Sequence, residues 1–190
     1  MPLSTLDPIT ALIVVDLQRG IVDHPMLHPF SEIIARTRDL LDAFRAEDLP
    51  VVLVNVDGRA PGRTEHGPRA TQTFAEGWTE LVPELGQQPG DLLVTKRSWG
   101  AFATTDLEAQ LKARGVTQVV VTGVATSVGV EATARQAYEQ GFHVTLAIDA
   151  MTDLRKEAHE HSIGTIFPRL GETGTTQEIL SLLAKRSVTA

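Results

Sequence analysis

The chain has 190 residues, of which 42% are hydrophobic and 22% charged, as in ordinary globular proteins. This length predicts a single domain over residues 1–190. The net charge of −7 argues against nucleic acid or an anionic membrane as a partner. No apolar run approaches the roughly 20 residues that span a bilayer, and no signal-peptide pattern opens the chain, so we expect a cytoplasmic protein. The sequence contains no cysteine, which excludes disulfides, thiolate metal sites and thiol catalysis.

The first predicted strand, Ala11–Val15, is followed directly by Asp16. A carboxylate at the carboxyl end of a buried strand lies at the ligand crevice of a parallel sheet, where its pKa is open to large shifts. A charge that caps a loop or pairs with Arg19 is the equally weighted structural alternative. Apolar residues from 33 to 44 recur at helical spacing and predict a helix with Ser31 as its N-cap. The second predicted strand is Val51–Val56.

An irregular loop rich in arginine, glycine and proline follows the second strand at residues 57–69. Arg59 and Arg63 are candidates for binding a substrate anion, because guanidinium groups clamp carboxylates. A solvated loop that makes subunit contacts is the alternative. Asp57 and His66 match no strong metal-ligand spacing. Trp78 is a candidate wall of the pocket, although a buried aromatic residue needs no substrate to explain it.

The third predicted strand, Asp91–Thr95, ends at Lys96, and Trp99 follows as a further candidate contact to substrate. If neighbouring strands bring Lys96 to Asp16, the ammonium would lower the pKa of the carboxyl and hold it charged. Lys96 could instead bind a substrate oxygen, or simply reach solvent. Thr105 with Glu108 predicts a capping box for the next helix.

The stretch from Val119 to Gly141 is the centre of the predicted site. Val119–Thr122 is a predicted buried strand, and a helix then runs to Gly141. Backbone N–H groups from Thr126 to Gly129 are expected to point unpaired into the crevice, where they would bind a carboxylate or an oxyanion. The candidate substrate contacts in this segment are therefore Val124, Ala125, Thr126 and Ser127.

The last third of the chain predicts a strand at Val144–Ile148 with Asp149 at its end, then a helix over Asp153–Phe167. His159 and His161 are two residues apart and cannot share a helix face, so they do not form a zinc motif. The last predicted elements are a short strand at Leu170–Glu172 and a helix capped by Thr175 and Glu178. Strands alternating with helices predict an α/β fold, a doubly wound three-layer sandwich around a parallel sheet of about six strands. No G-x-G-x-x-G motif supports dinucleotide binding.

Three ordered segments resemble the isochorismatase-like hydrolase superfamily: ALIVVDLQRGI, then TKRSWGAF with TTDL, then GVATSVGVEATARQAYEQGF with IDAMTD. The resemblance covers nearly the whole chain. It implies a Rossmann-like α/β/α sandwich with a six-stranded, mainly parallel sheet, and a homodimer or higher homo-oligomer. It also implies a cis peptide bond at Val124–Ala125. The sequence of the third segment most resembles a subgroup that lacks the catalytic cysteine.

The amide-cleaving members of that superfamily use an aspartate, a lysine and a cysteine. Asp16 and Lys96 match the first two positions, and Gly129 matches the third. Without a cysteine, a thiolate acyl-enzyme route is closed. Arg59 stands where the nicotinamidase zinc site has a histidine, so we predict no zinc and no cofactor.

Isochorismatases of the superfamily also have glycine at the third position, and they hydrolyse a vinyl ether without an acyl intermediate. By resemblance, Asp16 would then act as a general acid assisted by Lys96, on a small and anionic substrate. Two alternatives stay open. One is an amide or ester hydrolase that uses Ser127 or Thr126 as nucleophile, and the other is a non-catalytic ligand-binding protein on the same fold.

Overall fold

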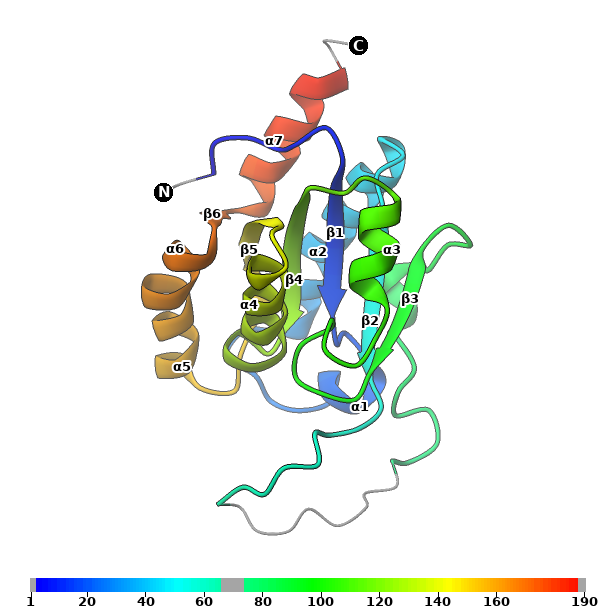
Figure 1. Cartoon of the computed structure of the whole chain (residues 1–190). Helices are drawn as coiled ribbons and strands as arrows, with labels where there is room; N and C mark the ends of the chain where they lie inside the picture. Colours follow the sequence, from blue (N-terminus) through cyan, green and yellow to red (C-terminus); the bar gives the residue numbers. More distant parts are fainter. Residues whose placement is uncertain (1–2, 66–73, 188–190) are drawn as a thin grey trace.

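The computed structural model describes residues 3–65 and 74–187. Its centre is a sheet of six parallel strands in the order β3-β2-β1-β4-β5-β6. Figure 1 shows the sheet with the strands pointing toward the end of the molecule that carries α1. The strands are β1 (Thr10–Val15), β2 (Val51–Val56), β3 (Leu92–Lys96), β4 (Gln118–Val124), β5 (His143–Thr152) and β6 (Glu172–Gly174). The predicted α/β sandwich is therefore confirmed.

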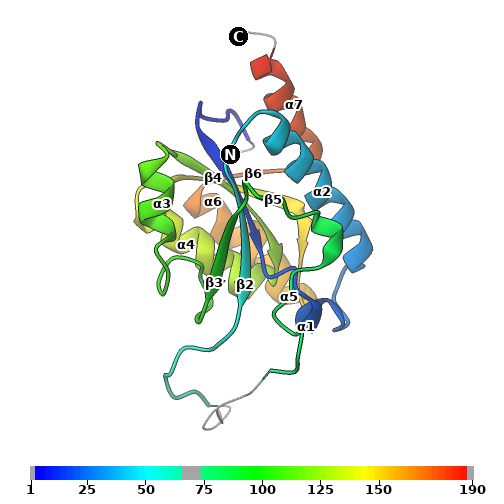
Figure 2. The same cartoon turned by 90° about the vertical axis from the view of Figure 1, so that its right-hand side faces the viewer.

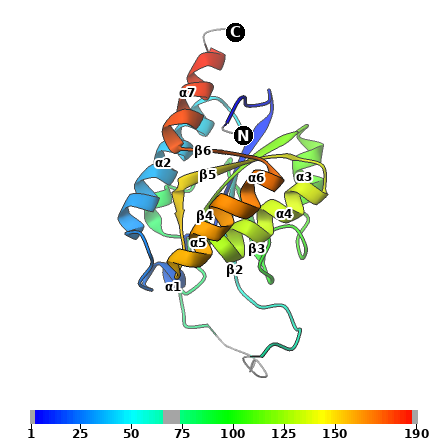
Figure 3. The same cartoon turned by 90° about the vertical axis from the view of Figure 1, so that its left-hand side faces the viewer.

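Helices cover both faces of the sheet, and the alternation of side chains along each strand divides the core into two. Ile13 and Val15 of β1 pack with α3, α4 and α6, whereas Leu12 and Val14 pack with α2 and α7. Figures 2 and 3 show these two helical layers on opposite sides of the strands. The helices are α1 (Arg19–Val22), α2 (Phe30–Ala46), α3 (Leu107–Ala113), α4 (Glu131–Glu139), α5 (Lys156–His161), α6 (Phe167–Leu170) and α7 (Thr176–Ser187).

The described chain has three further helical segments: a 3-10 turn at Pro83–Leu85 and two π-helical turns at Thr126–Val130 and Ser162–Ile166. The first π-turn runs directly into α4, so the predicted helix after β4 exists but is wider than an α-helix in its first turn. Wide π-turns inside helices are rare, and they occur frequently at functional sites. Within the described residues, no helix is long and apolar enough to cross a membrane.

Helix starts were predicted with mixed success. Thr175 and Glu178 form the expected capping box of α7, because the Thr175 N–H and hydroxyl bind the Glu178 carboxylate and the Glu178 N–H binds the Thr175 hydroxyl. Ser31 is wrong as an N-cap, since α2 begins one residue earlier after Pro29. Thr105 accepts the N–H of Leu107 at 3.2 Å, but the carboxylate of Glu108 pairs with a lysine of its own helix and closes no box.

The end of β5 differs from prediction, and this difference changes what lies at the crevice. β5 extends to Thr152, beyond the predicted end at Ile148, through a shift in its register with β4. Asp149 therefore lies inside the strand, where its carboxylate binds the N–H and hydroxyl of Thr176 and caps α7. The last strand begins at Glu172 rather than Leu170.

Candidate active site

A cavity of about 740 Å³ opens at the carboxyl ends of β1 to β5. Asp16, Lys96 and Gly129 all line it, although they come from segments that are far apart in the sequence. The parallel order of the strands explains this convergence, because the residues that follow neighbouring strands meet at one edge of the sheet. This edge is the end of the sheet toward which the β1 arrow points in Figure 1.

Asp16 and Lys96 form a buried ion pair at the floor of the cavity. The distance between Lys96 Nζ and Asp16 Oδ2 is 2.8 Å, and the two side chains are 1% and 7% exposed, respectively. The pairing proposed from the sequence is confirmed. Asp16 leaves β1 with φ +54°, a left-handed conformation that aspartate tolerates better than most residues. The second carboxylate oxygen, Oδ1, is buried and has no hydrogen-bond partner among the described residues.

The electrostatics of this pair differ from the expectation. Burial raises the pKa of the Asp16 carboxyl from its ordinary value of 3.8 to about 6, while the Lys96 ammonium acts in the opposite direction. Desolvation of the charged carboxylate outweighs the attraction to the lysine. The expectation of a lowered pKa is therefore wrong, and a fraction of the Asp16 carboxyls carries a proton near neutral pH.

Lys96 has a second partner, the backbone carbonyl of Trp99. This carbonyl belongs to the loop that follows β3, so the loop helps to hold the ammonium against Asp16. A lysine ammonium has three donors, and these two acceptors account for two of them.

Gly129 lies in the π-turn and borders the carboxylate. A Cβ atom placed on it would lie 3.1 Å from Asp16 Oδ2, 3.0 Å from Val15 Cγ1 and 2.9 Å from the Val124 carbonyl oxygen. Glycine therefore keeps the space beside the carboxylate free of any side chain. The peptide bond between Val124 and Ala125, which leads into the turn, is cis, at the position where the resemblance placed one.

The hydroxyls of Thr126 and Ser127 do not line the cavity, in contrast to their predicted role. Thr126 is fully buried, and its hydroxyl binds the Thr152 carbonyl at 3.1 Å and His159 Nδ1 at 2.8 Å. Burial and the nearby His28 lower the pKa of His159. These contacts anchor the π-turn to β5 and α5.

The expected row of unpaired N–H groups is also wrong at two of its positions. The N–H of Ser127 donates to Asp153 Oδ2 at 2.7 Å, and the N–H of Val128 donates to the Ala125 carbonyl at 3.0 Å. The start of this turn is therefore satisfied by the protein itself. Val124 and Ala125 do line the cavity, as predicted.

Aromatic side chains form one wall of the cavity. Trp78 stacks on Phe74 with ring centroids 3.9 Å apart, and both line the cavity together with Trp99, which is 58% exposed. Trp78 sits directly over Gly20, where a Cβ atom would lie 2.0 Å from the indole ring. Phe74 was missed from the sequence because it lies in an irregular loop where no pattern distinguishes it.

Two guanidinium groups reach the cavity, Arg59 from the loop after β2 and Arg155 from the segment after β5. Arg63 is exposed and does not line the cavity, so of the two predicted arginines only Arg59 lies at the cavity. His66 lies outside the described residues. Arg155 was missed because the predicted end of β5 fell four residues too early and put Asp149 at the crevice instead.

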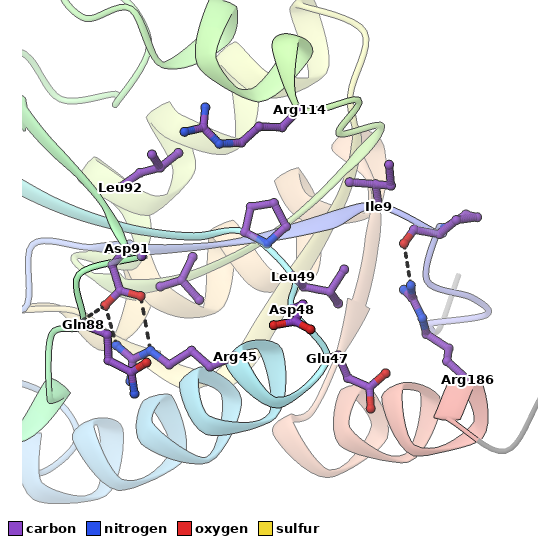
Figure 4. A pocket seen from close by; sticks show the side chains of 14 residues that line it. Ile9, Arg45, Glu47, Asp48, Leu49, Gln88, Asp91, Leu92, Arg114 and Arg186 are labelled. Carbon is purple, nitrogen blue, oxygen red and sulfur yellow. Dashed lines mark hydrogen bonds and ion pairs between the residues drawn. The ribbon is translucent and has the colours of Figure 1, made fainter. Parts of the chain in front are cut away.

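A second cavity of about 680 Å³ lies at the opposite end of the sheet, near the amino ends of the strands (Figure 4). Its buried carboxylate, Asp91, already pairs with Arg45 at 2.6 Å, and Arg186 donates to the Asp7 carbonyl. These charged groups hold the fold together. Over residues 3–65 and 74–187, no three His, Cys, Asp or Glu side chains gather as a metal site would require.

Comparison with known proteins agrees with this geometry. The isochorismatase domain model matches residues 10–178. The uncharacterized isochorismatase family protein YwoC of Bacillus subtilis is 40% identical over 177 residues, covering 90% of this chain and 92% of YwoC. Ureidoacrylate amidohydrolase RutB of Stutzerimonas stutzeri is 31% identical over 199 residues, covering 87% and 80% of the two chains.

A solved structure shares the whole architecture. The isochorismatase family protein from Burkholderia thailandensis superposes with a TM-score of 0.90 at 39% identity, covering 95% of this chain and 98% of its own. The family match over nearly the full length and the close agreement of the folds lead to one conclusion. The chain belongs to the isochorismatase family, a family of hydrolases.

Proposed function

We propose that this protein hydrolyses a small anionic molecule without a covalent intermediate, with Asp16 as general acid. The observation that carries the proposal is the buried Asp16 carboxyl at the cavity floor, with an unpartnered oxygen and a pKa raised to about 6. A carboxyl group with a pKa close to the operating pH is suited to proton transfer in both directions. Gly129 supports the same proposal, because residue 129 brings no nucleophilic side chain to the space beside the carboxyl.

Vinyl-ether hydrolysis, as in isochorismatases, fits these groups. The Asp16 carboxyl would donate its proton to the terminal carbon of the enol-ether double bond, leaving an oxocarbenium ion. Water adds to that cation and returns a proton to the Asp16 carboxylate. The hemiketal then collapses, its carbon–oxygen bond breaks, and pyruvate and an alcohol are released. Lys96, 2.8 Å from Asp16, stabilises the carboxylate that exists between the two proton transfers.

The cavity walls support an anionic substrate with a flat or cyclic body. Arg59 and Arg155 line the cavity, have no ion-pair partner among the described residues, and belong to a chain with a net charge of −7. Guanidinium groups bind carboxylates through paired hydrogen bonds. The stacked Phe74 and Trp78 offer an apolar face to the rest of the molecule.

The amide or ester alternative is less well supported by the geometry. RutB is named as an amidohydrolase, but here the Thr126 hydroxyl is buried against His159 and Ser127 lies outside the cavity lining. An acyl adduct on either residue, detected by mass spectrometry after reaction with an amide or ester panel, would restore that alternative.

The test is pyruvate release from isochorismate by the purified protein and by Asp16→Asn. Asp91→Asn is the matched control, because Asp91 is also a buried carboxylate in an ion pair, 2.6 Å from Arg45 at the other end of the sheet. We expect release by the wild type and the control, and its loss in Asp16→Asn. Release that survives in Asp16→Asn refutes the proposal for Asp16. No release by any of the three removes isochorismate as substrate, and no turnover on the amide and ester panel either would favour a ligand-binding protein.

A further inference from the structure

The loop after β3 is held against α4 by two side chains of that helix. The N–H of Ala101 donates to the Thr133 hydroxyl at 3.1 Å, and the N–H of Phe102 donates to Gln136 Oε1 at 2.9 Å. Thr133 and Gln136 are three residues apart, so they lie on the same face of α4. The same loop carries the Trp99 carbonyl that binds Lys96.

The Thr133 hydroxyl makes two hydrogen bonds at once. It accepts from Ala101 and donates to the Gly129 carbonyl at 2.7 Å, and the side chain is fully buried. A bond from a helical threonine to the carbonyl four residues earlier is common. The bond from a separate loop is the unusual part. Through it, one hydroxyl joins the segment that carries Gly129 to the loop that holds Lys96.

Gln136 adds a second point of close contact. A Cβ atom on Gly100 would lie 2.3 Å from Gln136 Oε1, so the Gln136 side chain can keep this position only while residue 100 has no side chain. Gly100 follows directly after Trp99, whose carbonyl therefore lies one residue from the contact. The residues that follow Trp99 are therefore held against α4, and this fixes the backbone next to the carbonyl that binds Lys96.

We propose that Thr133 and Gln136 are positioning residues for the Asp16–Lys96 pair, acting through the Trp99 carbonyl. Neither residue lines the cavity, and the side-chain oxygens of both bind the backbone of the loop rather than Asp16 or Lys96. The inference rests on the proposed function for its catalytic meaning. Its structural content, that α4 holds the lysine against the carboxylate, stands independently.

Loss of this support has a defined electrostatic consequence. Without the Thr133 hydroxyl, the Ala101 N–H loses its partner, the loop relaxes, and Lys96 loses the Trp99 carbonyl. A buried ammonium with fewer acceptors moves toward solvent, and its attraction for the Asp16 carboxylate then weakens. Lys96 and burial are the influences on the pKa of Asp16, and Arg59 and Arg155 are the other cationic side chains that line the cavity. The carboxyl should therefore hold its proton more tightly.

The experiment is a ¹³C NMR titration of the Asp16 carboxyl, whose signal is assigned by its absence in Asp16→Asn. It compares the wild type with Thr133→Val, which keeps the shape and removes the hydroxyl, and with Thr133→Ser, which keeps the hydroxyl. Thr145→Val is the control, because Thr145 is equally buried and loses a comparable bond from Gln118 at 3.0 Å, at the far end of β5.

We expect the proton affinity of Asp16 to rise about tenfold in Thr133→Val, and to stay at the wild-type value in Thr133→Ser and Thr145→Val. An unchanged Asp16 titration in folded Thr133→Val overturns the inference, and so does an equal change in Thr145→Val. If Thr133→Val does not fold, Gln136→Met, which removes the acceptor for Phe102, undergoes the same titration with the same expected rise and the same overturning result.

The titration requires no turnover, so its outcome is separate from that of the proposed function. A shifted titration without pyruvate release would leave the positioning role in place and remove the reaction. Pyruvate release that depends on Asp16, together with an unshifted titration, would support the reaction and overturn the positioning role.

Discussion

The raised pKa of Asp16 makes the stability of the fold depend on pH in a direction that can be measured. The folded protein binds a proton at Asp16 with a pKa of about 6, whereas the unfolded chain does so at the ordinary 3.8. Between these two values the folded state holds more protons than the unfolded state, so stability falls as pH rises and is regained on acidification. This is opposite to the behaviour of an aspartate whose ion pair lowers its pKa.

The magnitude follows from the two pKa values. Proton linkage at this one carboxyl adds roughly 1 kcal/mol to the free energy of unfolding when the pH falls from about 7.5 to about 5. Asp16→Asn removes this titration while leaving every other ionisable group in the sequence, so the difference between the two proteins isolates the contribution of Asp16.

The assay is urea unfolding of the wild type and Asp16→Asn at both pH values, with Asp91→Asn as the control for removing a buried carboxylate elsewhere. The free energy of unfolding of the wild type should rise by roughly 1 kcal/mol relative to that of Asp16→Asn on going to the lower pH. If the difference in the free energy of unfolding between the two proteins stays constant, or if Asp16→Asn gains more stability on acidification, burial does not outweigh Lys96 in setting the pKa of Asp16.

Three further substitutions test other parts of the structure. Gly123→Ala should lower the free energy of unfolding, measured with urea, by more than about 3 kcal/mol, because φ is +114° and the new Cβ would lie 2.1 Å from a β1 carbonyl oxygen. A variant as stable as the wild type would contradict the close approach of β4 to β1. Gly20→Ala should displace Trp78 and raise KM while kcat changes less, because the new methyl group would overlap the indole ring; steady-state kinetics with unchanged KM would remove Trp78 from the binding wall. Arg155→Ala should raise KM for an anionic substrate about tenfold, whereas Arg63→Ala, outside the cavity, should leave KM unchanged; equal effects would contradict the assignment of the cavity.

The fold was predictable because its signals are local. Each strand is a short apolar run, and the alternation of these runs with helical patterns fixes a parallel sheet. The predicted bounds of β2 match the structure in full, and β1 differs by one residue. The end of β5 was not predictable, because its register shift against β4 depends on the packing of the two strands rather than on the sequence of either.

The site was predictable as far as position along a strand determines it. Asp16 and Lys96 end their strands, and parallel pairing through β2 brings those ends together. The direction of the Asp16 pKa was not predictable, since it depends on how completely the folded protein excludes water from the carboxyl. Arg155 and Phe74 were missed for a related reason, because each is placed by the tertiary structure and neither lies in a recognisable pattern.

If a protonated Asp16 performs the chemistry, pyruvate release from isochorismate must slow as the pH rises through the pKa of this carboxyl. We expect kcat to be highest below a pKa of about 6 and to fall about tenfold for each pH unit above it, as the carboxyl loses its proton. We also expect Asp16→Asn to release no pyruvate across this pH range. A kcat that rises with pH through this range, or an active Asp16→Asn, would show that a protonated Asp16 is not the acid.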